Sequence, residues 1–337
     1  MTLLSLLLVL LAFLSGWAGT AAVRRYSLAR NILDIPNHRS SHAVPTPRGG
    51  GLSISIVVLL SILLLAWIGS LRDIFLIALL PACFFVALIG WVDDHRPLPA
   101  AVRGLGYLMA AVWFVFWTGV SSVVVGAVLV LGIAWLTNLY NFMDGTDGLA
   151  GSQAVLAGIA GGGLLWIQGH PDIALLAFVM AAASAGFLVL NWPPAKIFMG
   201  DVGSCLLGFL FACLAILGEL LAGLPALLWL VLLGFFVWDA TLTLLMRIFR
   251  RERWYSAHKC HAYQRLIQLG LSHGQLLALF IIFNLLVLWP LAWWGYQQPG
   301  LLLVAVFLSV VATGLIWLIV QVYYYRMTAG GQHIAEN

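Results

Sequence analysis

Residues 138–151 read Asn-Leu-Tyr-Asn-Phe-Met-Asp-Gly-Thr-Asp-Gly-Leu-Ala-Gly, and this stretch decides how the rest of the chain must be arranged. It holds two amides and two carboxylates at intervals of three residues, in a chain with only 8% charged residues. An ionised carboxylate against hydrocarbon is costly unless it is paired, metal-bound or hydrated. The spacing places Asn138, Asn141 and Asp144 along one helix face, before a glycine-flanked turn that presents Asp147. The stretch therefore predicts a site for a metal ion and a polar ligand.

Composition identifies the chain as an integral membrane protein. Of its 337 residues 63% are hydrophobic, and its charged share of 8% compares with about a quarter in an ordinary soluble domain. Its apolar runs are long enough to cross a hydrocarbon core of about 30 Å as helices that rise about 1.5 Å per residue. We predict an all-α, polytopic membrane helical bundle with about eleven transmembrane helices. The expected spans are 3–23, 52–69, 74–92, 104–118, 121–139, 149–168, 173–190, 204–222, 226–246, 274–295 and 301–325.

The basic residues predict the orientation, because cytoplasmic loops carry an excess of lysine and arginine. With a periplasmic N-terminus and a cytoplasmic C-terminus, 15 of the 16 basic residues are cytoplasmic and only Arg72 lies outside. The first helix could instead be a signal peptide, but no basic region precedes its apolar run, and Arg24 and Arg25 follow it. We therefore expect a retained helix and one integral membrane domain over 1–337. The cytoplasmic loops would be 24–51, 93–103, 138–148, 191–204 and 247–273.

Two further acidic motifs fall on the same predicted side. Asp93 and Asp94 end the third helix, where adjacent carboxylates repel each other and recruit a cation unless they form a solvated helix end. Asp201 begins the eighth helix after a proline-broken loop, where it is either a helix cap or a metal ligand. Because two helices separate the Asp pair from the opening stretch, helix parity brings all of these carboxylates to one rim of the bilayer.

The basic loops offer sites for phosphate. Residues 45–51 read Pro-Thr-Pro-Arg-Gly-Gly-Gly, and they either touch lipid headgroups or present Arg48 and main-chain N–H groups to an anion. The most basic loop contains His258-Lys-Cys-His261. Membrane topology alone does not explain these two histidines, which are suited to binding a diphosphate. Zinc is disfavoured there, because no second pair of ligands accompanies the histidines and the cysteine.

Taken in order, these motifs resemble the polyprenyl-phosphate N-acetylhexosamine-1-phosphate transferases, glycosyltransferase family 4, which includes phospho-N-acetylmuramoyl-pentapeptide transferase. Each motif is weak alone, but the ordered set covers nearly every predicted cytoplasmic loop. The matching motifs are PTPRGGG at 45–51, DD at 93–94, NxxNxxDGxDG at 138–148, FMGDVGS at 198–204 and HxxHxYQ at 258–264.

Two local features refine the resemblance. The Asn-His-Arg-Ser-Ser-His start at 37–42 and the short histidine loop most resemble the branch that initiates O-antigen or lipopolysaccharide chains. The separated His258 and His261 stand where the muramoyl-pentapeptide enzymes carry three histidines, which argues against a peptidyl substrate. Arg39 or Arg48, and Arg103, replace lysines of those relatives.

The resemblance implies transfer of N-acetylhexosamine 1-phosphate from a UDP-sugar to undecaprenyl phosphate, with release of UMP. This would be the first lipid-linked step of cell-envelope polysaccharide synthesis. It implies Mg²⁺ as cofactor, with Mn²⁺ as an alternative, and a UDP-N-acetylhexosamine, undecaprenyl phosphate and membrane lipid as partners, without nucleic acid. A homodimer stays open, as do GlcNAc, GalNAc, FucNAc and QuiNAc as sugars. The implied location is the bacterial inner membrane, with many spans and a site formed by the cytoplasmic loops.

The resemblance also implies a role for each residue. Asp93 would orient or deprotonate the lipid phosphate, and Asp94 would support it or join the metal shell. Asp201 is the first expected metal ligand and Asn141 the second. The expected nucleotide pocket contains the catalytic carboxylates Asp144 and Asp147 together with Thr46, Asn138 and Asn191. Substrate phosphates are expected to be held by Arg48, Arg103, Lys196, His258 and His261.

Three other classes of protein would use similar residues. A polytopic secondary transporter places its polar site near the bilayer midplane, whereas these acidic motifs gather on one side. An Mg²⁺-dependent intramembrane prenyltransferase would carry NDxxDxxxD, which this sequence lacks. A CDP-alcohol phosphotransferase would continue its first Asp-Gly with x-x-Ala-Arg, whereas Asp147-Gly148 continues with Leu-Ala-Gly.

Overall fold

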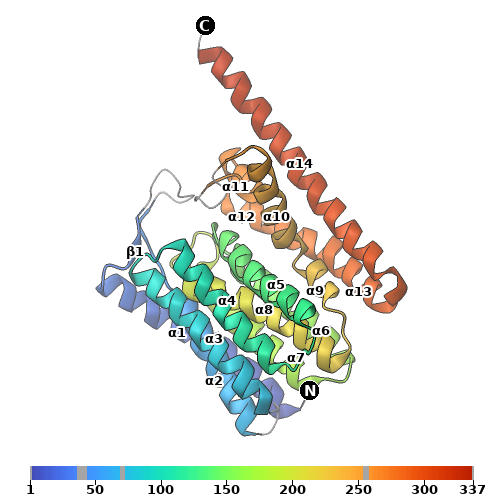
Figure 1. The fold of residues 1–337 in the computed structure, drawn as a ribbon. Helices are drawn as coiled ribbons and strands as arrows, with labels where there is room; N and C mark the ends of the chain where they lie inside the picture. The colour runs from blue at the N-terminus through green and yellow to red at the C-terminus, as the bar shows by residue number, and fades with distance from the viewer. Residues whose placement is uncertain (1, 36–43, 69–72, 253–257, 336–337) are drawn as a thin grey trace.

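The computed structural model describes residues 2–35, 44–68, 73–252 and 258–335 (Figure 1). Within these ranges the chain is an all-α bundle with one short antiparallel strand pair, which confirms the predicted fold class. The strands β1 (Leu33–Asp34) and β2 (Thr46–Pro47) pair Asp34 with Thr46 and Leu33 with Pro47. The motif at 37–42, with Arg39, and the predicted outer residue Arg72 lie outside the described residues.

The helices follow the predicted apolar runs with small shifts at their ends. The first eight are α1 (Leu3–Ala29), α2 (Gly51–Trp67), α3 (Asp73–His95), α4 (Ala100–Trp117), α5 (Val123–Phe142), α6 (Leu149–Ile167), α7 (Pro171–Asn191) and α8 (Asp201–Ala222). The remainder are α9 (Leu227–Leu232), α10 (Gly234–Phe249), α11 (Ala262–Gln268), α12 (His273–Phe283), the π-turn η1 (Asn284–Leu288), α13 (Trp289–Gln297), the 3₁₀ turn η2 (Pro299–Leu301) and α14 (Leu302–Ala335).

Two of the predicted spans are less regular than expected. The run 226–246 is divided at Leu233 into α9 and α10, just before a glycine that lowers helix propensity. The run 274–295 continues through the π-turn η1 between α12 and α13. Within the described residues, nine helices are long and apolar enough to cross a membrane, and α2 is a shorter apolar helix of 17 residues. The α9–α10 pair accounts for the other predicted span.

The helix α8 forms the centre of the bundle. In its most apolar window 83% of the residues are buried, compared with 17% in α1. It packs against α3 and α5, with α2 crossing its N-terminal end. At that crossing an added Cβ on Gly51 would lie 2.3 Å from the Cα of Gly203, so the two backbones meet directly. In lipid the hydrophobic effect does not drive helices together. Small residues at a crossing let the two backbones approach closely, and van der Waals contacts then stabilise the pair.

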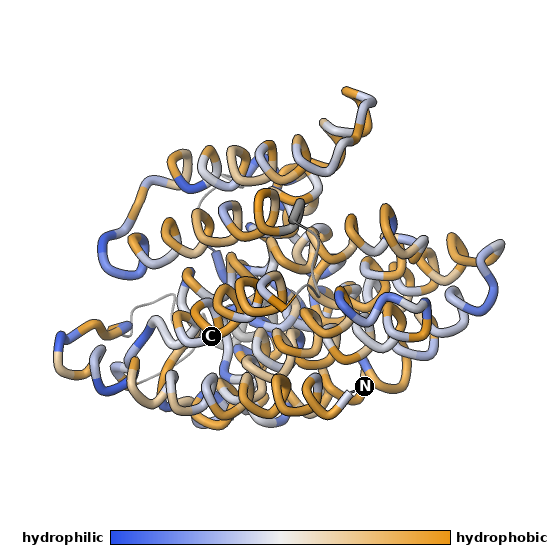
Figure 2. Tube along the Cα trace, turned by 90° about the horizontal axis from the view of Figure 1, so that it is seen from below, coloured by the Kyte–Doolittle hydropathy of each residue, from blue (hydrophilic) through white to orange (hydrophobic). Residues whose placement is uncertain are grey.

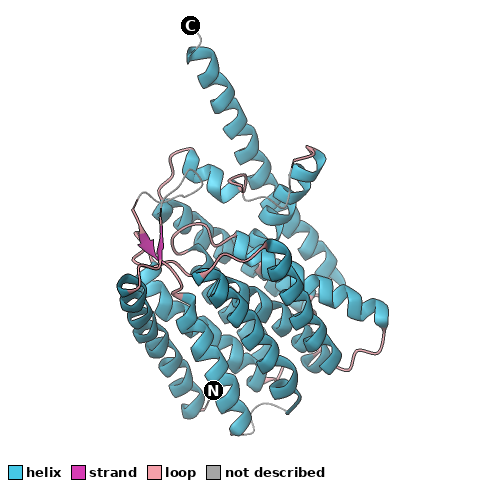
Figure 3. Ribbon diagram, turned by 60° about the vertical axis from the view of Figure 1, so that its left-hand side comes forward, coloured by secondary structure: helices cyan, strands magenta, loops and turns pink. Residues whose placement is uncertain are grey.

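The connections that carry the acidic and basic motifs lie at one end of the bundle. Figure 3 shows the strand pair beside loops at one end of the bundle. Arg48, just after the strand pair, contacts the end of α3, and Asp147 between α5 and α6 contacts Ala195 between α7 and α8. Hydrophobic residues run along the helices, and hydrophilic residues gather mainly at their ends (Figure 2). The architecture therefore places polar groups from distant parts of the chain at a common rim.

Candidate active site

Arg103 joins two of the predicted acidic motifs. Its Nη1 donates to Asp93 Oδ2 at 2.9 Å and to Asp201 Oδ2 at 2.7 Å. Arg103 lies in the first turn of α4, Asp93 near the end of α3, and Asp201 at the first position of α8. The structure thus brings these two carboxylates together around one guanidinium group, as the helix parity predicts.

Asp94 caps the helix that carries Asp201. Its carboxylate accepts hydrogen bonds from the main-chain N–H groups of Asp201 at 3.0 Å and Val202 at 3.2 Å. The first N–H groups of a helix have no partner within the helix, and a carboxylate there also favours the helix dipole. Gly200 precedes the helix with a φ of +78°, and an added Cβ would lie 2.6 Å from the Asp94 carboxylate. Asp94 therefore fixes the position of Asp201.

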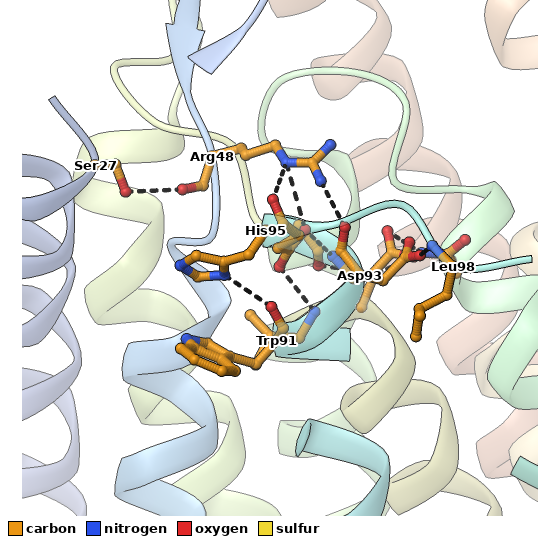
Figure 4. Close-up of polar contacts among 12 residues, drawn as sticks. Ser27, Arg48, Trp91, Asp93, His95 and Leu98 are labelled. Carbon is orange, nitrogen blue, oxygen red and sulfur yellow. Dashed lines mark hydrogen bonds and ion pairs between the residues drawn. The ribbon is translucent and has the colours of Figure 1, made fainter. Parts of the chain in front are cut away.

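Arg48 closes the other end of the same arrangement (Figure 4). Its Nε donates to the main-chain oxygen of Asp94 and its Nη2 to that of Asp93, both at 3.0 Å. The carboxylate of Asp93 also accepts a hydrogen bond from the N–H of Leu98, and Ser27 Oγ donates to the main-chain oxygen of Arg48 at 3.0 Å. A basic side chain at a helix C-terminus satisfies the last carbonyls. Arg48, expected to bind substrate, thus has its guanidinium group against the end of α3.

The two asparagines of the 138–148 motif point to different partners. Asn141 Nδ2 donates to Asp201 Oδ1 at 3.0 Å and to Ser204 Oγ at 2.9 Å. Asn138 Nδ2 instead donates to the main-chain oxygen of Ala134 at 2.9 Å, one turn earlier in α5. Asn141 therefore contacts Asp201, the expected metal ligand, whereas the amide nitrogen of Asn138 forms a hydrogen bond within α5.

The acidic cluster contains more carboxyl groups than guanidinium groups. With Asp93, Asp94 and Asp201, Asp144 makes four carboxyl groups, and among the described residues the guanidinium groups paired with them are those of Arg48 and Arg103. The pKa of Asp144, in the loop after α5, is raised well above its usual value, chiefly by burial and then by the charges of Asp201 and Asp94. This crowding opposes ionisation of the carboxyl groups, and a bound cation would offset it.

The residues present fit a magnesium ion whose other ligands would be water and the phosphates of the substrate. Among the described residues no three His, Cys, Asp or Glu side chains are grouped as a ready metal site. Mg²⁺ usually takes only one or two protein carboxylates and keeps waters and phosphate oxygens as its other ligands. Asp201 supplies one carboxylate for such an ion, whose binding would replace a hydrogen bond that the Asp201 oxygens now accept from Asn141 or Arg103.

A pocket of about 530 Å³, a volume in the range of small-molecule sites, is lined by residues of the loops before α2, α6 and α8 and of the start of α12. Thr46, Asp147, Phe198 and His273 are among the residues that line it. Asp147 Oδ2 accepts a hydrogen bond from the N–H of Ala195 at 3.0 Å, and Oδ1 lies 3.1 Å from Nδ1 of His273. The expected nucleotide-binding residues Thr46 and Asp147 therefore share one cavity.

Two other expected binding residues lie outside this lining. Asn191 is buried, and its amide accepts from the N–H of Gly148 at 3.0 Å and donates to the oxygen of Ile197 at 2.9 Å. It thereby ties together the two loops that form the pocket wall. Lys196 is exposed, and its main-chain oxygen accepts a hydrogen bond from Arg24 at 3.1 Å.

The histidine loop is anchored by a buried carboxylate of α10. Asp239 accepts hydrogen bonds from the N–H groups of Ala262 at 2.9 Å and Tyr263 at 3.3 Å, the first residues of α11. His261 is buried, with its Nδ1 3.7 Å from Asp239. The sequence gives Asp239 no evident partner, and the structure shows that it caps α11. His261 thus lies against this cap.

His258, the other histidine of this loop, is uncharged at neutral pH. Burial, followed by the neighbouring His261 and the charge of Arg247, lowers the pKa of His258 to about 3. In the protein without substrate, His258 can therefore offer a phosphate a hydrogen bond but no positive charge.

Tyr263 connects the histidine loop to the acidic loop. Its hydroxyl donates to the main-chain oxygen of Phe142 at 2.9 Å, and an added Cβ on Gly145 would lie 2.2 Å from that hydroxyl oxygen. The sequence motifs did not predict the contacts of Tyr263 with Phe142, of Ser204 with Asn141 or of His273 with Asp147. Tyr263 and Ser204 stand inside recognised motifs, and the Ser-x-x-Gln pattern at 272–275 marks the helix start that carries His273.

The fold and the site together define a polytopic membrane protein with an acidic polar cluster at one end of its bundle. Its sequence matches the family described as glycosyl transferase family 4 over residues 76–219. It is 30% identical over 272 residues to the probable undecaprenyl-phosphate N-acetylglucosaminyl 1-phosphate transferase of Bacillus subtilis (strain 168), with 75% of each chain covered. The chain belongs to glycosyl transferase family 4, the polyprenyl-phosphate N-acetylhexosamine-1-phosphate transferases that its motifs resemble.

Further relatives fall in two branches of this family. The decaprenyl-phosphate N-acetylglucosaminephosphotransferase of Mycolicibacterium smegmatis is 29% identical over 330 residues, covering 86% of this chain and 80% of the relative. The phospho-N-acetylmuramoyl-pentapeptide-transferase of Streptococcus pyogenes serotype M6 is 30% identical over 210 residues, covering 54% of this chain and 62% of the relative.

Replacing Gly200 tests the cap on α8. Gly200→Ala would press a Cβ against the Asp94 carboxylate in a backbone region that is nearly reserved for glycine, at a cost of about 3 kcal/mol. The matched control is Gly223→Ala, where φ is +62° with open space around it, at a cost of about 1 kcal/mol. Thermal unfolding in detergent should separate the two variants, and equal losses would contradict the predicted clash.

A double-mutant cycle tests the contact of Tyr263 with the acidic loop. Gly145→Ala should destabilise the protein by about 2 kcal/mol, because its Cβ meets the tyrosine hydroxyl. In a Tyr263→Phe background most of this loss should disappear, so the two changes should not add. Gly163→Ala in α6, where an added Cβ meets nothing, is the control. Additive losses in denaturation experiments would show that the contact does not constrain the loop.

Proposed function

We propose that this protein transfers N-acetylhexosamine 1-phosphate from a UDP-sugar to a polyprenyl phosphate. An oxygen of the lipid phosphate attacks the β-phosphorus of the donor, the bond from that phosphorus to the bridging oxygen breaks, and UMP leaves. The observation that carries this proposal is the meeting of Asp93, Asp201 and Arg103 at the same end of an apolar bundle as the loops that line the pocket of Asp147. That position lets a membrane-held lipid phosphate and a water-soluble nucleotide reach the same groups.

Charge stabilisation is the main task of such a site, because several negative charges meet in the transition state. A bound Mg²⁺ would neutralise the charge that develops on the diphosphate, and Asp201 would hold it. Asn141 keeps the Asp201 carboxylate oriented through its amide. Arg103 is partly exposed and supplies a positive charge next to the same carboxylate.

Asp93 would orient the lipid phosphate. It lies near the end of α3 and shares Arg103 with Asp201, so a phosphate held by Arg103 would lie near both carboxylates. The second ionisation of a phosphate monoester occurs near pH 6, so the lipid phosphate is largely dianionic and needs little base catalysis. Asp144, whose pKa is raised, borders the same cluster.

The donor would occupy the pocket, with Thr46 and Asp147 near the nucleotide and Asn191 supporting the wall. Two of the relatives carry N-acetylglucosamine in their names, which favours UDP-GlcNAc as the donor. The name of the Bacillus relative likewise favours undecaprenyl phosphate as the acceptor. The product would start a cell-envelope polysaccharide such as O-antigen, on the cytoplasmic side of a bacterial inner membrane. A site at the helix ends favours transfer over secondary transport.

Asp201→Asn tests the reaction and the metal site together. With UDP-GlcNAc, undecaprenyl phosphate and Mg²⁺, the purified protein should release UMP, and Asp201→Asn should reduce the rate at least about 100-fold. Asp172→Asn is the matched control, because Asp172 also lies in the first turn of a helix, at the opposite end of the bundle. Absence of UMP release by the wild-type protein across a panel of UDP-N-acetylhexosamines would refute the function. Near-normal turnover of Asp201→Asn would remove this residue from the metal site.

Asp93→Asn tests the proposed division between chemistry and nucleotide binding. It should lower kcat about 100-fold while UDP binding stays within about twofold, since Asp93 lies with the acidic cluster and does not line the pocket. UMP release measures kcat, and calorimetry in detergent measures UDP affinity. Loss of affinity with preserved turnover would reverse the assigned roles.

A further inference from the structure

His273, which belongs to none of the family motifs, lies within the pocket against Asp147. Its Nδ1 is 3.1 Å from Asp147 Oδ1 and 3.4 Å from the main-chain nitrogen of Asp147. The side chains of His273 and Asp147 are 18% and 11% exposed, so the contact is partly shielded from water. The other carboxylate oxygen, Oδ2, accepts from the N–H of Ala195. Both carboxylate oxygens of Asp147 are therefore in contact with protein groups.

The two contacts of Nδ1 correspond to two protonation states. A protonated Nδ1, in the Nδ1–H tautomer or the imidazolium, donates to the carboxylate oxygen 3.1 Å away. An unprotonated Nδ1 instead accepts a hydrogen bond from the main-chain N–H of Asp147 at 3.4 Å. In either state His273 contacts Asp147 directly and restricts its movement.

The start of α12 is itself fixed, so His273 is a firm support. Ser272 caps the helix by accepting from the N–H of Gln275 at 3.2 Å, and its own N–H donates to Gln275 Oε1 at 2.9 Å. Leu277, one turn on, is buried against the acidic loop, since an added Cβ on Gly148 would lie 2.7 Å from its methyl group. The helix therefore packs directly on the loop that carries Asp147.

We propose that His273 is a positioning residue that holds the Asp147 carboxylate in one orientation and thereby sets the affinity for the nucleotide part of the donor. This inference rests on the proposed function of the pocket and adds a residue to it. Arg103 and the clustered carboxylates, where the phosphates would react, do not depend on the His273 contact. Loss of His273 should therefore raise KM for the UDP-sugar and leave kcat and KM for the lipid phosphate nearly unchanged.

Three substitutions separate positioning from direct ligand contact. Asparagine places an N–H near the position of Nδ1, whereas glutamine places its amide near the position of Nε2. We expect His273→Ala and His273→Gln to raise KM for the UDP-sugar about tenfold and weaken UDP binding equally. His273→Asn should return both values to within about threefold of wild type. His170→Ala, at the start of α7 at the far end of the bundle, is the control and should change neither value.

The outcomes are distinct. Unchanged KM and UDP affinity in His273→Ala would overturn the inference, and so would a fall in kcat at unchanged KM. Rescue by glutamine instead of asparagine would assign His273 to direct contact with the nucleotide and overturn the positioning role. If alanine prevents folding, the asparagine and glutamine variants still decide between these outcomes. A wild-type protein that turns over no UDP-sugar would refute the proposed function, while the comparison of UDP affinities would still test His273.

Discussion

The structure depends on keeping ionised carboxylates in a hydrocarbon-rich bundle without leaving their charge uncompensated. Transfer of an unpaired carboxylate into an apolar region is prohibitively costly, so each must find a donor. Arg103 meets this requirement for Asp93 and Asp201 at once, and in doing so it joins α3, α4 and α8 at one rim. The same contact that makes the charges tolerable also brings together the residues for which we propose phosphate orientation and metal binding. Stability and the geometry of the site therefore cannot be separated at this point of the fold.

A second device uses helix N-termini as partners for buried aspartates. Asp94 on α3 accepts from the first N–H groups of α8, and Asp239 on α10 accepts from those of α11. In each case the acidic side chain satisfies main-chain donors and gains from the positive end of the helix dipole. One cap fixes the helix that begins with Asp201, and the other fixes the loop that carries the histidines. The first cap thus positions Asp201 at the start of α8, and the second positions the histidine loop at the start of α11.

The sequence predicted what depends on local pattern and failed where long-range side-chain direction decides. Apolar run length was sufficient for the helices, and helix parity was sufficient to bring Asp93 and Asp201 to one end. The break at Leu233 was not predicted, because the only local signal is the single glycine that follows it within a long apolar run. No spacing rule could show that His273 meets Asp147, a contact across 126 positions of the chain. Roles taken from the family motifs remain predictions, since position at the rim does not establish chemistry.

The contacts nevertheless divide the predicted binding residues into two groups. Arg48 and Asn191 use their polar groups on helix ends and loop backbones and do not line the pocket, so they support the site without facing it. Arg103 is partly exposed at the cluster and Asp147 lines the pocket, where a substrate can reach them. A supporting side chain that faces away from the pocket cannot turn to a ligand without leaving the main-chain groups that it now pairs unpaired. We therefore expect substitutions in the first group to act through stability, and those in the second to act through binding and turnover.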